Sequence, residues 1–188
     1  MSLRHFPGLA AVATLALTGT LACGGSHEPA TSAGGSLPPY TPEAAVLFDD
    51  LIAPAVFGFD PEGRTPARDP HIRERTRVAD FVVPARVETV SRVGGVEHKG
   101  SYEITLKPNG PPLVGDPGNT PLILNIPATN SSYIWVEGAG AQWVGAPLLL
   151  FGRHYQDGAA VALHFRGEPD TPEFRKEVER DAGLRLLR

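Results

Sequence analysis

The amino-acid sequence predicts a mainly β fold with peripheral helices, in the form of a five-stranded barrel or, as the alternative, a β-sandwich. Between residues 81 and 168, five segments have the character of strands: four alternate apolar and polar side chains with the two-residue period of a half-buried strand, and residues 148–151 are continuously apolar. No helical pattern of the βαβ kind separates these segments. Helix-capping signals lie outside this region, near Thr41, Asp69 and Asp170.

The helical signals frame the strand region on both sides. Thr41-Pro42-Glu43 combines a capping residue, a proline at the first helical position and an acid in the first turn, which predicts a helix that ends near Pro54. Asp69-Pro70 predicts a second, short helix over residues 71–77. Residues 41–80 therefore form a helical N-terminal arm, and a capped start at Asp170-Thr171-Pro172 makes residues 169–188 a C-terminal helix.

The five predicted strands occupy residues 81–89, 101–107, 122–126, 148–151 and 161–165. The last two flank Asp157-Gly158, a pair that favours a tight hairpin turn. In the order of its strands and connections, the region 81–168 resembles the oligonucleotide- and oligosaccharide-binding barrels. The resemblance is one of pattern, and it implies a five-stranded, OB-like barrel domain.

Composition bounds the function. The chain has 188 residues, a formal charge of −4 and one cysteine. This length predicts one globular domain with tails, large enough to bury a core without disulfides. One cysteine excludes an intramolecular disulfide and a Cys-rich zinc site, and the mildly acidic balance argues against nucleic acid as a partner.

The N-terminal residues are typical of a secretory signal peptide. Residues 1–22 carry Arg4 and His5, then a short apolar run over residues 9–17, with no acid before Cys23. The stretch Thr20-Leu21-Ala22-Cys23 resembles the lipobox of bacterial lipoproteins. That resemblance implies that Cys23 is lipidated, with acyl chains such as palmitate as a membrane anchor, and that Gly24 favours delivery to the outer membrane. The alternative is a chance cysteine in an ordinary signal of a secreted or periplasmic protein.

Residues 23–40 are then the lipidated cysteine and a flexible tether. Residues 24–40 contain four Gly, three Pro and three Ser, the composition of a coil-like linker.

The sequence contains no strong catalytic or cofactor motif, so we expect no catalytic residue and no cofactor. His154 and His164, on the two arms of the last hairpin, are weak candidates for metal ligands. A two-residue turn would place their side chains on opposite faces of the hairpin, and only a three-residue loop would bring them to one face.

Two groups of side chains are candidates for binding. Arg73, Arg75 and Arg77 belong to a local basic excess that suits an anionic partner, unless it is simply a solvated helix face. The second group is aromatic. We expect Tyr133 and Trp135 to lie at the barrel rim as contact residues and Trp143 to lie in the core. The alternative is that all three close the barrel core.

Together these features predict a membrane-anchored lipoprotein of the cell envelope. We expect a non-catalytic binding or assembly module that recognises another envelope protein or a polysaccharide. The alternatives are a hydrolase of envelope polymers that uses His154 or His164, and a carrier of a small ligand inside the barrel.

Overall fold

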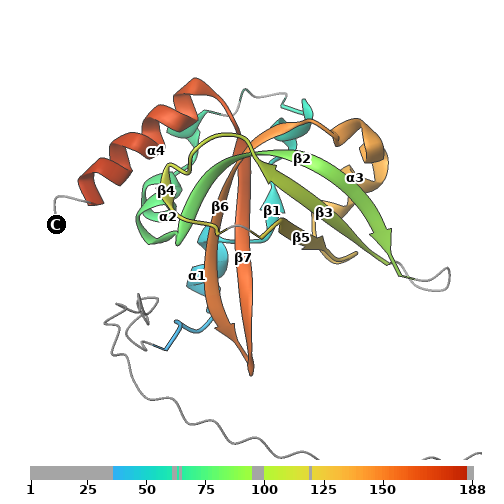
Figure 1. Cartoon of the computed structure of the whole chain (residues 1–188), viewed down its shortest axis with the longest axis horizontal. Coiled ribbons are helices and arrows are strands. Elements are labelled where there is room, and N and C mark those ends of the chain that lie inside the picture. The colour runs from blue at the N-terminus through green and yellow to red at the C-terminus, as the bar shows by residue number, and fades with distance from the viewer. Residues whose placement is uncertain (1–35, 61–62, 64, 95–99, 119, 186–188) are drawn as a thin grey trace, which may run out of the picture. The chain divides into compact units, whose positions relative to one another are not determined.

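One curved sheet of seven strands organises the described part of the chain (Figure 1). The structure, a computed structural model, describes residues 36–60, 63, 65–94, 100–118 and 120–185. The strands are β1 (Leu51–Ile52), β2 (Phe81–Val93), β3 (Ser101–Pro108), β4 (Val114–Gly115), β5 (Leu122–Ile126), β6 (Pro147–Asp157) and β7 (Ala160–Pro169). The helices are α1 (Pro42–Leu47), α2 (Ile72–Val78), α3 (Tyr133–Ala139) and α4 (Pro172–Arg185), with short 3₁₀ turns at Pro54–Phe57, Pro66–Arg68 and Gly140–Trp143.

The sheet is open. Its strand order is β1-β7-β6-β2-β3-β5, with β4 paired to β2, and among the described residues no pairing joins β5 to β1 or β7. Among the described strands, only β1 runs parallel to its neighbour, β7. The mainly β fold with helices is therefore confirmed, but the prediction of a closed five-stranded barrel is wrong. The alternative sandwich is not observed either, because the described strands belong to one sheet.

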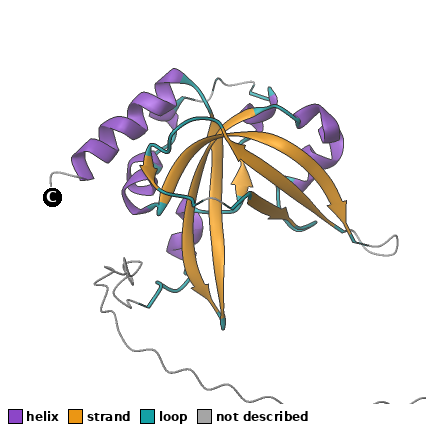
Figure 2. Cartoon of the chain, viewed as in Figure 1, coloured by secondary structure: helices purple, strands orange, loops and turns teal. Residues whose placement is uncertain are grey.

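The long strand β2 joins the two halves of the sheet. Its first residues pair with β6 and its last residues pair with β3. The β2–β3 register shifts between Val87 and Thr89. Such a bulge increases the local twist of a strand, and Figure 2 shows that the long strands of the sheet are curved and fan out from one another. The half of the sheet that consists of β3 and β5 therefore curves, but β5 does not pair with β7 among the described residues.

Both faces of the sheet are buried along the first half of β6, which explains the continuous apolar run at residues 148–151. Leu148 and Leu150 face a core shared with α3 and the 3₁₀ turns, and Leu149 and Phe151 face a second core shared with α1, α2 and α4. A strand covered on both sides has no polar face, so alternation disappears there. The helices are thus divided between the two faces of one sheet.

Several sequence-based boundaries change. Residues 51–52 form β1 where a helix was expected, and residues 114–115 form β4 between β3 and β5, where no strand was expected. Residues 133–143, expected as an aromatic rim, are helical. The chain joins the sheet at Pro39, within the expected tether, where a parallel bridge connects Pro39 to Gln156. The expected signal peptide and Cys23 lie outside the described residues.

Candidate functional site

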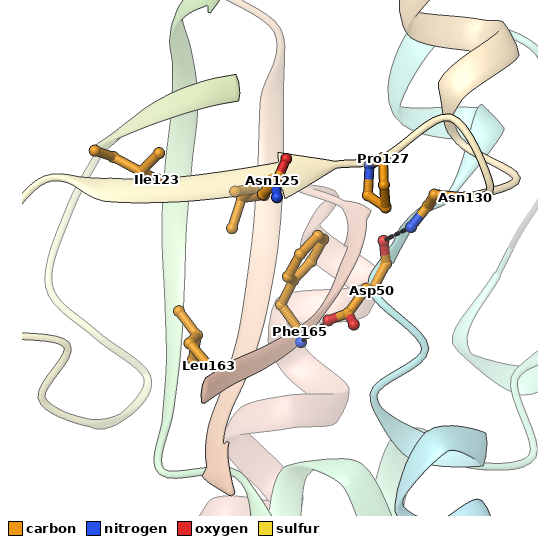
Figure 3. A pocket seen from close by; sticks show the side chains of 8 residues that line it. Asp50, Ile123, Asn125, Pro127, Asn130, Leu163 and Phe165 are labelled. Carbon is orange, nitrogen blue, oxygen red and sulfur yellow. Dashed lines mark hydrogen bonds between the residues drawn. The ribbon is translucent and has the colours of Figure 1, made fainter. Parts of the chain in front are cut away.

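A pocket of about 380 Å³ lies where the sheet fails to close (Figure 3). On one side it is lined by Ile123, Leu124 and Asn125 of β5, and on the other by Leu163 and Phe165 of β7. The Phe165 ring points toward β5. Asp50, Pro127 and Asn130 complete the lining. We call this pocket, between the edges of β5 and β7, the edge cleft.

Asp50 links the edge cleft to the sheet. Its φ of 56° is left-handed, which is uncommon for a residue with a side chain although Asp tolerates it better than most. The Asp50 carboxylate accepts a hydrogen bond from the Phe165 backbone N–H at 3.0 Å and interacts with His164 Nδ1 at 2.8 Å. Its carbonyl oxygen accepts from Asn130 Nδ2 at 2.8 Å. These bonds to three separate residues hold the backbone in its strained conformation.

The loop that carries Asn130 is fixed in turn. Asn130 Oδ1 accepts from the Ser132 backbone N–H at 2.7 Å, the local bond by which Asn stabilises turns. The Ser132 hydroxyl accepts from the Ile52 backbone N–H at 2.9 Å. The wall of the edge cleft is therefore tied to β1 by side-chain hydrogen bonds, and the pocket is preformed.

His164, which contacts the Asp50 carboxylate, is buried and covered by an aromatic ring. The Tyr40 ring stacks on the His164 imidazole with centroids 3.5 Å apart and an interplanar angle of 6°. The Tyr40 hydroxyl donates to the Phe48 carbonyl oxygen at 2.6 Å. His164 Nε2 is buried and has no hydrogen-bond partner within the described residues. Tyr40, the last residue of the expected tether, thus packs against His164, the residue that contacts the Asp50 carboxylate.

Burial governs the protonation of these groups. It raises the pKa of the Asp50 carboxyl, although the Phe165 N–H and His164 act in the opposite direction. Burial, with the nearby Asp50 and Asp49 carboxylates, raises the pKa of Tyr40 to about 12. Tyr40 therefore stays neutral, as its role as a hydrogen-bond donor requires.

The two histidines considered as metal ligands do not converge. The hairpin register pairs His154 with Leu163 and Arg153 with His164, so the two imidazoles lie on opposite faces of the hairpin. His154 contacts Asp80 at 3.0 Å on the surface, whereas His164 contacts Asp50. No group of three His, Cys, Asp or Glu side chains suited to a metal occurs in the described ranges.

The three arginines do not form one basic surface. Arg73 and Arg77 are exposed and lie 3.7 Å from Asp181 and Glu74, respectively. Arg75 is 2% exposed, and its guanidinium donates to Asp69 at 2.6 Å and to the Leu47 carbonyl oxygen at 2.7 Å. Arg75 is therefore not accessible to a partner, and its prediction as a binding residue is wrong. It lies on the side of the short helix α2 that faces the core.

The aromatic residues also separate. Trp143 is buried and stacks on Phe57, with centroids 3.4 Å apart, as expected of a core residue. Tyr133 is buried beside Tyr102, because α3 turns it toward the sheet, so it is not a rim contact. Trp135 is half-buried and lies 5.3 Å from the exposed Phe59. Of the two predicted contacts, Trp135 alone reaches the surface.

Sequence reasoning missed the edge cleft itself. The sequence analysis assigned no role to Asp50 or Asn125, because neither residue belongs to a recognisable motif. The available signal was the cluster of Asn and Ser residues at 130–132, which is typical of a turn that folds back on its neighbours.

Comparisons with family models, curated proteins and solved structures found no match for this chain. Among the described helices, none has the length and apolar character needed to cross a bilayer.

Proposed function

We propose that this protein is a lipid-anchored, non-catalytic binding module of the cell envelope, and that the edge cleft receives another envelope component. The anchor rests on the sequence of residues 1–23, with its apolar run and the lipobox-like segment before Cys23. Acyl chains on Cys23 would hold the module at the outer membrane, and the linker that follows would give it reach.

One observation carries the binding role: the edge cleft lies between two sheet edges that do not pair with each other. Its lining combines apolar side chains, Ile123 and Leu163, with the amides of Asn125 and Asn130 (Figure 3). Binding sites commonly combine a largely apolar lining with a few fixed polar groups. The hydrogen bonds from Asn130 and Ser132 keep the pocket formed before a ligand arrives, which lowers the ordering cost of binding.

The alternatives draw less support. A hydrolase that used His154 or His164 would need a reacting group beside one imidazole, but the hairpin directs these side chains to Asp80 and Asp50 on opposite faces. The hydroxyl of Ser132 does not offer a free reacting group either, because it is hydrogen-bonded to the Ile52 backbone. A carrier would need an enclosed interior, whereas this pocket opens at the sheet edge.

The experiment compares affinity capture from detergent-solubilised envelopes by three forms of the protein. Ile123 lines the edge cleft and is 55% exposed, so Ile123→Arg blocks the cleft without disturbing the core. Leu184, which is 54% exposed on α4, provides the matched control Leu184→Arg. We expect the captured component to be lost with Ile123→Arg and retained with Leu184→Arg. Equal capture by both variants would contradict the proposal.

A further inference from the structure

Where β1 begins, two residues of β7 direct their backbone N–H and C=O groups away from β6. Asp50 N donates to the Phe165 carbonyl oxygen at 2.9 Å, and Ala53 N donates to the Gly167 carbonyl oxygen at 2.8 Å. The backbone N–H and C=O groups of Phe165 and Gly167 therefore face outward, since in an antiparallel ladder residues alternate between inward and outward bonding.

The same direction continues down the strand beyond β1. The β6–β7 register runs without a shift from residue 169 to residue 160, so Leu163 and Val161 share the outward orientation of Phe165. Within the described residues, β1 pairs with β7 only at Arg166 and Gly167. The N–H and C=O groups of Val161 and Leu163 thus form a short edge to which no described strand is paired.

Asp50 lies at the end of this edge that is nearest to β1. Its carboxylate accepts the Phe165 N–H, the group that a neighbouring strand would otherwise use. Asp157 lies at the other end, next to the hairpin turn, and is exposed. Asp157 pairs with Ala160, so its side chain lies on the face opposite to that of Val161 and Leu163. Among the described residues lining the edge cleft, Asp50 alone is charged. An occupant with basic residues complements this charge.

The side chains beside the edge are apolar and accessible. Val161 is 60% exposed, and Leu163 and Ile123 line the edge cleft from β7 and β5, respectively. Natural edge strands are usually protected by lysine, proline or a bulge, because an unprotected edge pairs with other chains. Residues 160–163 contain Ala, Val, Ala and Leu and carry none of these protections.

We propose that the edge cleft binds an extended segment of another protein, which adds as a strand to β7 through the backbone groups of Val161 and Leu163. The segment places an apolar side chain against Leu163 and Ile123, with a basic residue toward Asp50. This inference rests on the proposed function and selects a polypeptide as the bound component. A polysaccharide has no repeating N–H and C=O groups at strand spacing, whereas strand addition uses them directly.

The test uses short random peptides displayed on phage and selected against the full-length chain, with soluble chitin oligosaccharides, which contain no peptide, as the saccharide probe. Amide hydrogen exchange then follows individual backbone N–H groups. In the free protein, we expect the Val161 and Leu163 amides to exchange faster than those of Ala162 and His164, which point toward β6. Bound peptide should slow exchange at Val161 and Leu163 by at least tenfold, and replacing its basic residues with Glu should weaken binding.

Two variants separate the backbone from the side chain. Leu163→Ala removes apolar contact and keeps the N–H, whereas Leu163→Pro also removes an N–H that lies outside the β6 ladder. We expect Leu163→Pro to bind selected peptides about tenfold more weakly than Leu163→Ala, the loss of roughly one hydrogen bond. If Leu163→Pro does not fold, the exchange pattern of the unaltered chain still decides.

Three results would overturn the inference. Peptides or saccharides that bind in the edge cleft, as judged by loss with Ile123→Arg, but leave Val161 and Leu163 unprotected would refute strand addition and leave the proposed function standing. Protection that grows with protein concentration, without peptide, would show that a second copy of the chain is the occupant. If no probe binds in the cleft, the proposed function fails as well.

Discussion

Replacing Arg75 with Met tests how the structure uses its most deeply buried arginine. The side chains of Arg75 and Asp69 are each 3% exposed and lie 2.6 Å apart. Glu168, which is fully buried, lies 3.8 Å from the Arg75 guanidinium and also binds Arg166 at 2.8 Å. Met fills a similar volume but leaves Asp69 without this cation and the Leu47 carbonyl oxygen without its donor.

The expected cost follows from these contacts. Breaking a buried ion pair by removing one partner costs about 3 to 5 kcal/mol, since the remaining charge stays in the interior. For a domain of this size, each kcal/mol shifts the melting temperature by roughly 2 to 4 °C, so the decrease should be about 6 to 20 °C. Urea unfolding monitored by tryptophan fluorescence gives the free energy directly.

The exposed arginines of the same helix supply the control. Arg73→Met and Arg77→Met should change the free energy of unfolding by no more than about 0.5 kcal/mol, as is usual for surface sites. Adding Asp69→Asn to Arg75→Met should recover part of the loss, because it removes the charge left behind. A loss below about 1 kcal/mol for Arg75→Met would refute the reasoning.

Three further predictions follow. Trp143→Ala should cost about 3 to 5 kcal/mol of unfolding free energy and Trp135→Ala about 1 to 2, because Trp143 is buried and Trp135 half-buried; equal denaturation midpoints would contradict this. Burial raises the pKa of Asp50, so the folded state holds this proton more tightly than the unfolded chain, and stability should fall as pH rises from the ordinary aspartate range, about 4, through the raised pKa. Asp50→Asn should lack that decrease in urea titrations between about pH 4 and pH 7, and an identical pH slope in both proteins would refute the assignment. Cys23→Ser should release the protein from membranes in fractionation experiments, while an unmodified Cys23 thiol found by mass spectrometry would contradict the lipoprotein proposal.

The sequence predicted the main strands because their patterns are local. Each of the five expected segments corresponds to an observed strand, and the capping signals at Thr41 and Asp170 begin α1 and α4. The two-residue strands β1 and β4 could not be predicted in this way, because neither is long enough to show a period. Their pairing depends on partners far along the chain, such as Arg166 for Leu51.

Closure of the sheet was equally beyond local reasoning. A barrel and an open sheet share the same alternation along each strand, and they differ only in whether the edge strands meet. Here the bulge near Val87 and the pairing of β1 beside β7 set the edges apart. The edge cleft that results draws on Asp50, Asn125 and Leu163, three positions that no sequence window brings together.

The candidate binding residues show the same limit. Arg73, Arg75 and Arg77 are evenly spaced, but helical geometry turns Arg75 inward and leaves the other two in solvent. For Tyr133 and Trp135, the deciding factor was α3, which the Gly-rich sequence around residues 138–140 had concealed.

The most direct test of the edge cleft as the binding site is photo-crosslinking in intact envelopes. A photoreactive phenylalanine analogue is placed at Ile123, at Leu184 on α4, or at Ile134 on α3, each of which is exposed. We predict a defined adduct with another polypeptide from position 123 and none from positions 134 and 184. Adducts from position 134 with none from position 123 would place recognition at the surface around Trp135 and contradict the edge cleft.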